Sequence, residues 1–133
     1  MSLILVIEDD ASLQRVLTRI LEREGHTVRV ADDGLAGVRV FREARPDLVL
    51  TDLQMPGVNG IEVILMLQAA APDLPVIAMS GGKISQGLDL LTGAQLLGAV
   101  DLLPKPFSVP DVLGVVNRAL RIRSHEDAGG AAG

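Results

Sequence analysis

The sequence contains no cysteine, tryptophan or tyrosine, and only two histidines, His26 and His125. Without cysteine it has no disulfide, no thiolate nucleophile and no cysteine-bound zinc, and two histidines make a histidine-built metal site unexpected. No apolar run approaches the roughly 18 residues that a membrane span needs. The formal net charge of −5 argues against direct binding of nucleic acid or of an anionic membrane. We therefore expect a cytoplasmic protein with an aliphatic core.

The length and composition are typical of one globular domain. The chain has 133 residues, of which 48% are hydrophobic and 22% charged, so it can bury a sizeable core. The last ten residues or so are small and polar, which is typical of a chain end that packs against nothing. We therefore expect a domain over residues 1–123 and a disordered tail or linker stub over residues 124–133.

Short apolar segments alternate with segments of helical periodicity along the domain. Strands are expected at residues 3–7, 26–30, 47–51, 75–79 and 100–103. Helices are expected over the apolar stripe 13–21, after the cap Asp33, over 61–71 and 85–97, and after the cap Ser108. Five strands alternating with five helices predict an α/β fold, a single doubly wound parallel sheet with helices on both faces.

Polar side chains stand where the predicted strands end. Glu8 and Asp9 follow the first strand, Asp52 the third, Ser80 the fourth, and Lys105 comes just after the fifth. Because ligands of open parallel sheets bind outside the carboxyl ends of the strands, we expect these five side chains to converge on one edge.

Such a cluster predicts a particular chemistry. Two carboxylates about 4 Å apart repel by about 4 kcal/mol at an effective dielectric constant near 20, so a proton or a cation is needed among them. Hard oxygen ligands suit Mg²⁺. A carboxylate beside Mg²⁺ can attack phosphorus and form an aspartyl phosphate. An amine and a hydroxyl would then match the charge of the phosphoryl group.

Four segments of the chain carry the strand ends and the loops that follow them: ILVIEDD (4–10), DLVLTDLQMPG (47–57) followed by Asn59 and Gly60, PVIAMSG (75–81) and GAVDLLPKPF (98–107). In order and spacing they resemble the CheY-like receiver domain of bacterial two-component response regulators. Together they cover roughly residues 3 to 122. Each motif alone is modest, but four in register are a strong signal.

The resemblance implies roles for the residues at the strand ends. Asp52 would accept the phosphoryl group. Glu8 and Asp9 would hold Mg²⁺, directly or through water, together with Asp52 and the backbone carbonyl of Gln54. The neighbouring Asp10 is expected to start or cap the first helix instead of binding metal.

The family's pattern also implies the fold and the partners of the site. Ser80 would hydrogen-bond the phosphoryl group, Lys105 would pair with it, and the Lys105–Pro106 bond would be cis. The strand order would be 2-1-3-4-5, the flavodoxin-like arrangement. The donor would be the phosphohistidine of a sensor histidine kinase or phosphotransfer protein.

The implied function is a phosphorylation-dependent switch of protein contacts, a signalling module that catalyses its own phosphorylation and dephosphorylation and is not a classical enzyme. Its output would be an unknown protein, a missing output domain, or a homodimer through the fourth helix, fifth strand and last helix. The sequence does not separate a stand-alone regulator from a domain of a longer one.

Two features depart from the family's pattern or stand out in it. Leu102 occupies a position where the family often has an aromatic side chain that reports phosphorylation, so that device cannot work here in its usual form. The predicted helix over 85–97 carries more leucines than one buried stripe needs. Both a docking surface and irregular burial account for them.

Three other classes of function remain to be weighed. A phosphatase that forms an aspartyl phosphate needs a second aspartate two residues after the nucleophile, where this chain has Gln54. A flavin or nucleotide module is disfavoured because no glycine-rich phosphate loop follows a strand. A receiver-like scaffold that is never phosphorylated is disfavoured by the complete set of five site residues.

Overall fold

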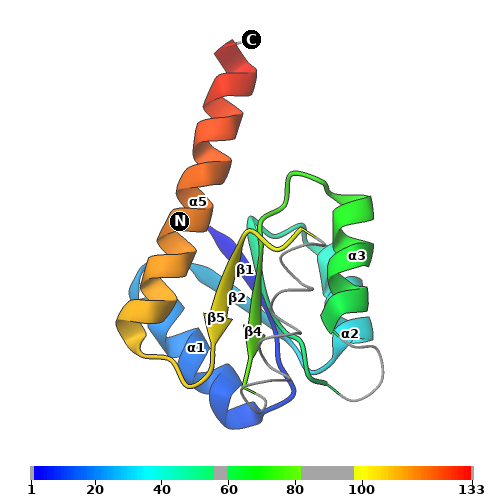
Figure 1. Cartoon of the computed structure of the whole chain (residues 1–133), viewed down its shortest axis with the longest axis vertical. Coiled ribbons are helices and arrows are strands. Elements are labelled where there is room, and N and C mark those ends of the chain that lie inside the picture. The colour runs from blue at the N-terminus through cyan, green and yellow to red at the C-terminus, as the bar shows by residue number, and fades with distance from the viewer. Residues whose placement is uncertain (1, 56–59, 82–97, 133) are drawn as a thin grey trace.

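The computed structural model describes residues 2–55, 60–81 and 98–132 (Figure 1). The strands are β1 (Leu3–Ile7), β2 (Thr27–Ala31), β3 (Leu48–Asp52), β4 (Val76–Ser80) and β5 (Asp101–Pro104). The helices are α1 (Ala11–Arg23), α2 (Gly34–Glu43), α3 (Gly60–Ala70) and α5 (Val109–Ala132). The helix predicted over 85–97 lies outside the described residues.

The strands form one parallel sheet in the order β2-β1-β3-β4-β5. This confirms the predicted doubly wound sheet and its order. Order reverses at β1, whose neighbours β2 and β3 lie on opposite sides of it, so a crevice is expected outside the carboxyl ends of β1 and β3.

Both faces of the sheet are buried, and alternate residues of each central strand supply them. On β1, Leu5 and Ile7 join one core cluster, whereas Ile4 and Val6 join the other. Helices α2 and α3 cover the first face and α1 and α5 the second (Figure 1). Burial on both sides explains why these strands read as unbroken apolar runs.

The helix caps lie where the sequence indicates them. Asp10 and Asp33 accept hydrogen bonds from backbone N–H groups in the first turns of α1 and α2. At the start of α5, the N–H of Ser108 donates to Asp111 and the N–H of Asp111 donates to the Ser108 hydroxyl. Gly25 ends α1 with φ = 89°, a conformation that glycine adopts without strain.

Helix α5 continues to Ala132 and projects beyond the sheet (Figure 1). The backbone of residues 124–132 is therefore helical, where the sequence predicts a disordered tail. The first part of α5 is packed on the sheet through Val112, Val116 and Ala119. Adding turns to an existing helix costs far less than starting one, so the packed part can extend outward. The domain boundary at 123 stays a prediction.

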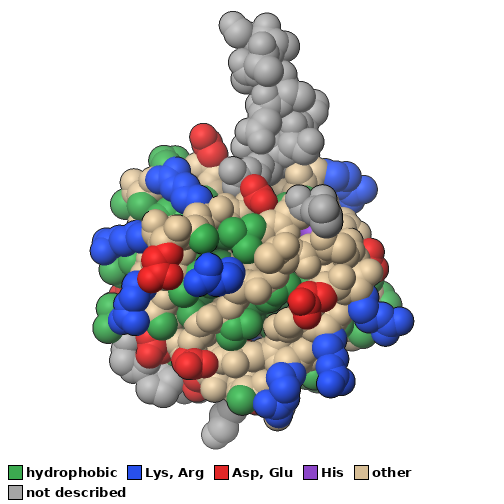
Figure 2. Space-filling model, turned by 180° about the vertical axis from the view of Figure 1, so that it is seen from behind, with side chains coloured by type: hydrophobic (Ala, Val, Ile, Leu, Met, Phe, Trp, Pro, Cys, Tyr) green, Lys and Arg blue, Asp and Glu red, His purple; other side chains and the backbone are tan. Residues whose placement is uncertain are grey.

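The surface carries charges of both signs. On the face in Figure 2, basic and acidic side chains of the described residues are interspersed, and neither sign forms a continuous patch. A nucleic-acid interface would need a continuous basic stripe, which the described part of this face lacks. Within the described residues, no helix combines the length and the apolar character that crossing a membrane requires.

Candidate functional site

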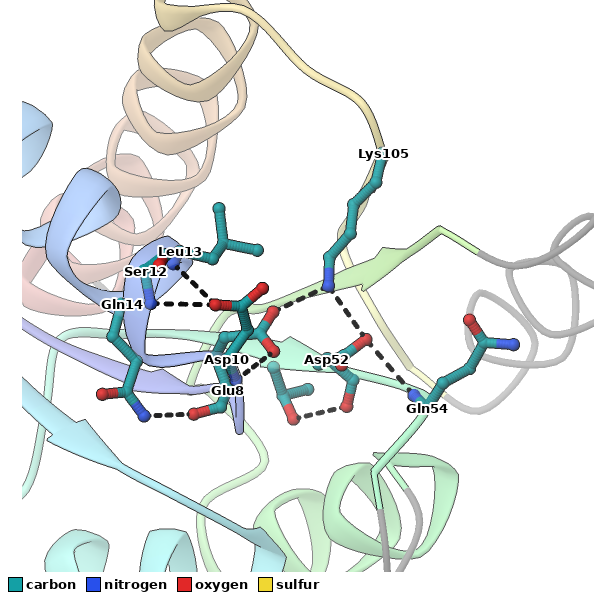
Figure 3. Close-up of polar contacts among 9 residues, drawn as sticks. Glu8, Asp10, Ser12, Leu13, Gln14, Asp52, Gln54 and Lys105 are labelled. Carbon is teal, nitrogen blue, oxygen red and sulfur yellow. Dashed lines mark hydrogen bonds and ion pairs between the residues drawn. The ribbon is translucent and has the colours of Figure 1, made fainter.

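The five side chains singled out from the sequence stand at one edge of the sheet. Glu8 and Asp9 follow β1, Asp52 ends β3, Ser80 ends β4, and Lys105 follows β5. Each of the three acidic residues offers a carboxylate oxygen, and these oxygens all lie within 4.8 Å of one another. Figure 3 shows Glu8, Asp52 and Lys105 pointing toward one another from the ends of three different strands.

Lys105 lies between two buried carboxylates. Its Nζ is 2.7 Å from Oε1 of Glu8 and 3.5 Å from Oδ1 of Asp52. The side chain of Glu8 is 1% exposed and that of Asp52 4%, so this ammonium group offsets much of their repulsion. The Lys105–Pro106 peptide bond is cis, as the family resemblance implies.

Gly81 leaves room for the stem of Lys105. A Cβ at position 81 would lie 2.9 Å from the Cβ of Lys105, closer than real Cβ atoms approach their neighbours. The backbone N–H of Lys105 also donates to the carbonyl of Ser80, at 2.8 Å. The ends of β4 and β5 are thereby joined directly behind the site.

The pKa of Glu8 is shifted by its surroundings. Burial raises the pKa of its carboxyl group above the ordinary value, and the nearby charge of Asp52 raises it further. The hydrogen bond from Lys105 and the one from the N–H of Asp10, 3.1 Å long, act in the opposite direction. One ammonium among three carboxylates leaves the pocket negative, so a divalent cation would be stabilised there.

The end of β3 is held through its backbone. Oδ1 of Asp52 accepts a hydrogen bond from the N–H of Gln54 at 3.2 Å. The backbone carbonyl of Asp52 accepts one from the Thr51 hydroxyl at 3.1 Å. Helix α3 begins directly against this backbone, because a Cβ on Gly60 would lie 2.3 Å from the carbonyl oxygen of Asp52. Sequence reasoning placed Gly60 in the loop before the helix predicted over 61–71, whereas it is the first residue of α3.

Ser80 is the unusual polar group of this edge. Its Oγ is buried and has no hydrogen-bond partner among the described residues. Leaving a buried hydroxyl unsatisfied costs about 1–3 kcal/mol, so the hydroxyl is available to a group that binds at the site. The donor set, three carboxylates, one ammonium and one free hydroxyl, fits a metal-bound phosphoryl group.

Two further predictions concern Gln54 and Leu102. The backbone N–H of Gln54 donates a hydrogen bond to Oδ1 of Asp52. The role of the Gln54 carbonyl as a metal ligand stays a prediction. Leu102 is half-buried on β5 and packs against the core cluster that α2 and α3 cover. An aliphatic side chain therefore fills the position where the family often has an aromatic ring.

Gln14 was missed by the sequence analysis. It lies in the first turns of α1, and its amide nitrogen donates to the backbone carbonyl of Glu8 and to Oδ1 of Asp32, the latter at 2.8 Å (Figure 3 draws the first contact). The only signal in the sequence was a polar residue near the start of the helix. Its partners are set by the tertiary fold.

The chain is similar to longer curated proteins over most of its length. It is 38% identical over 125 residues to the DNA-binding response regulator MtrA of Mycolicibacterium paratuberculosis, covering 94% of this chain and 54% of MtrA. It is 37% identical over 117 residues to the DNA-binding transcriptional regulator NtrC of Rhizobium meliloti, covering 88% of this chain and 24% of NtrC. The chain thus spans about half of the length of MtrA and about a quarter of the length of NtrC.

Solved structures are also similar to this chain over most of its length. A response regulator receiver domain protein from Clostridium thermocellum superposes with a TM-score of 0.87 at 28% identity, covering 93% of this chain and 98% of that one. NtrX from Brucella abortus superposes with a TM-score of 0.93 at 26% identity, covering 99% of this chain and 29% of that one. The sequence family described as the response regulator receiver domain matches residues 4–117. The chain therefore belongs to the response regulator receiver domain family, the signalling module of two-component systems.

Proposed function

We propose that this domain is a switch in which Asp52 accepts a phosphoryl group from the phosphohistidine of a sensor histidine kinase or phosphotransfer protein. The observation that carries the proposal is the buried carboxylate of Asp52 beside Glu8, Asp9 and Lys105. No other cluster of three such acidic residues occurs among the described residues.

The reaction is a transfer between two nucleophiles. An Oδ atom of Asp52 attacks phosphorus, and the new O–P bond forms as the N–P bond of the phosphohistidine breaks. The electron pair of that bond returns to the imidazole nitrogen of the donor. Later attack by water on the phosphoryl group regenerates the carboxylate and releases phosphate.

Glu8, Asp9 and Asp52 would hold Mg²⁺, with the backbone carbonyl of Gln54 as a further proposed ligand. When bound, Mg²⁺ neutralises charge on the carboxylates and on the phosphoryl oxygens. The hard oxygen donors and the negative pocket support this assignment.

Lys105 and Ser80 would stabilise the charge that arrives with the phosphoryl group. The ammonium group of Lys105 already lies 3.5 Å from Oδ1 of Asp52, so a short movement of its flexible stem brings it to a phosphoryl oxygen. The unpartnered Ser80 hydroxyl would donate to another. Both residues stand at the starts of the loops after β4 and β5, so their movement would change those loops.

The donor needs a surface beside the site, and one is present. A groove of about 390 Å³ lies next to Lys105 and is lined by Leu13, Val16, Pro106 and Phe107, among others. Val16 is 49% exposed, so apolar surface lies open beside this groove. We propose that the phosphohistidine-bearing partner rests here while its phosphoryl group reaches Asp52.

The output of the switch takes one of the forms predicted from the sequence. Because the curated relatives are longer and are DNA-binding regulators, an output domain or partner acting on DNA is one form. A homodimer through the helix predicted over 85–97, β5 and α5 is another.

The test is the intact mass of the protein after incubation with Mg²⁺ and acetyl phosphate. We expect the mass of one phosphoryl group to be added to the wild type, and no addition to Asp52→Asn or to the wild type without Mg²⁺. The absence of an adduct under conditions that preserve acyl phosphates would instead support a scaffold that is not phosphorylated.

A further inference from the structure

Gln14 joins three elements at the edge of the sheet that carries the site. Its backbone N–H donates to the carbonyl of Asp10 at 2.9 Å, which fixes it in the first turns of α1. Its side-chain amide reaches the last peptide of β1, at the carbonyl of Glu8, and the residue that follows β2, at Oδ1 of Asp32 (2.8 Å). Figure 3 shows the amide lying directly against the Glu8 backbone.

The chemistry of the two contacts requires a donor at this position. A backbone carbonyl and a carboxylate both accept hydrogen bonds, so the NH₂ of the Gln14 amide must face them, and each of its two hydrogens has an acceptor. An apolar side chain of the same length would leave both acceptors without this partner.

The carbonyl of Glu8 and the N–H of Asp9 belong to the same rigid peptide plane. Fixing the carbonyl therefore fixes the plane, and with it the position of the Asp9 backbone from which the carboxylate side chain starts. The N–H of Glu8 is held by the carbonyl of Ala31 at 3.0 Å, so the preceding peptide is fixed as well.

Asp9 depends on this backbone more than its neighbour does. The side chain of Glu8 is buried and is held by Lys105 and by the N–H of Asp10. Asp9 is exposed and makes no hydrogen bond or ion pair with the described residues, yet its carboxylate oxygen lies within 4.8 Å of those of Glu8 and Asp52. With no side-chain contact of its own among the described residues, the Asp9 carboxylate depends for its placement on the backbone that carries it, which begins with the peptide that Gln14 contacts.

We propose that Gln14 is a positioning residue for the metal site. It orients the Glu8–Asp9 peptide so that the Asp9 carboxylate points to the cation, and Asp32 holds the Gln14 amide in place. This inference rests on the proposed function, since it assumes that Glu8, Asp9 and Asp52 bind Mg²⁺. Mutating a residue that hydrogen-bonds and orients a metal ligand typically weakens metal binding by 10- to 100-fold.

The experiment compares Gln14→Met with Gln68→Met. Gln68 is the matched control because its amide also donates to a backbone carbonyl, that of Gly98 at 3.3 Å, which precedes β5 at the opposite edge of the sheet. Mg²⁺ is titrated into each metal-free protein and followed through the amide signals in ¹H–¹⁵N NMR spectra. These spectra also establish that each variant is folded, and Gln14→Ala serves if methionine disturbs the fold.

We expect Gln14→Met to bind Mg²⁺ at least tenfold more weakly than the wild type, with a shifted Asp9 amide signal before any metal is added. Gln68→Met should bind as the wild type does. Wild-type affinity in folded Gln14→Met, or an equal loss in Gln68→Met, would overturn the positioning role alone. If wild type does not bind Mg²⁺, or Asp9→Asn binds it equally well, the proposed metal site fails and this inference with it.

Discussion

Replacing Gly60 with alanine tests how closely α3 begins against the phosphoacceptor strand. A Cβ at this position would lie 2.3 Å from the carbonyl oxygen of Asp52 and 2.5 Å from the Cα of Leu53. Both atoms belong to the backbone at the end of β3, so neither can turn aside as a side chain would. Because ordinary contact begins near 3.4 Å, the helix and the strand end must separate by about 1 Å.

The expected cost follows from two opposing effects. Forcing extra volume into a packed site typically destabilises by about 1–3 kcal/mol. Alanine improves on glycine by about 1 kcal/mol inside a helix, but Gly60 is the first residue of α3, where this gain is smaller. We therefore expect Gly60→Ala to lower the free energy of unfolding by about 2 kcal/mol, measured by urea denaturation without Mg²⁺. Phosphorylation of Asp52 should also slow, because its backbone is displaced.

Gly114→Ala is the matched control within α5. The nearest atom to a Cβ there, outside the helix's own backbone, is Nη1 of Arg118 at 3.5 Å, an ordinary contact. This substitution should stabilise the protein by up to about 1 kcal/mol through helix propensity alone. Wild-type stability in Gly60→Ala, or an equal loss in Gly114→Ala, would refute the reasoning.

Further substitutions probe the other contacts. Ser80→Ala removes a buried hydroxyl that has no partner among the described residues, so the free energy of unfolding should stay equal or rise by up to about 1 kcal/mol. The rate of phosphorylation should fall. A clear loss of stability would contradict this reasoning. Asp10→Ala removes the cap of α1 and should cost about 1 kcal/mol in urea unfolding, with the Mg²⁺ requirement for phosphorylation retained if Asp10 is no metal ligand. Burial lowers the pKa of His26 below 6.5, so its contribution to stability is fully present above pH 6.5 and is lost as the pH falls from there through the lowered pKa; its NMR signal should titrate below pH 6.5, and a higher midpoint would exclude this effect. Arg118→Ala breaks a partly exposed ion pair with Asp101 and should lower stability by less than about 1 kcal/mol, so a larger loss would indicate a further role for Arg118.

The strands could be predicted because burial on both faces leaves an unbroken apolar run. Their ends could not be placed to the residue. The fourth strand was predicted over 75–79 and is Val76–Ser80, and the third was predicted over 47–51 and is Leu48–Asp52. In both strands the last residue is polar and stands where the predicted apolar run stops, and it remains in the sheet through pairing with a neighbouring strand. Strand ends are set by such pairing, which a local pattern does not contain.

The convergence of the site residues also followed from the sequence, since parallel strands bring their carboxyl ends to one edge. The contacts within the site did not. The ion pair between Lys105 and Glu8 joins residues 97 positions apart. The hydrogen bond from Gln14 to Asp32 depends on how the start of α1 lies beside the end of β2. The Ser80 hydroxyl has no hydrogen-bond partner among the described residues, and only the folded structure reveals this.

The central claim, that Asp52 is the phosphoacceptor, is tested most directly by finding the residue that carries the phosphoryl group. The protein is phosphorylated with acetyl phosphate and Mg²⁺ and reduced with borohydride, which converts an aspartyl phosphate to homoserine, and its peptides are analysed by mass spectrometry. We predict homoserine at position 52 and unmodified Glu8 and Asp9. Conversion of Asp9 instead, or unmodified Asp52 in protein that has gained a phosphoryl group, would contradict the account.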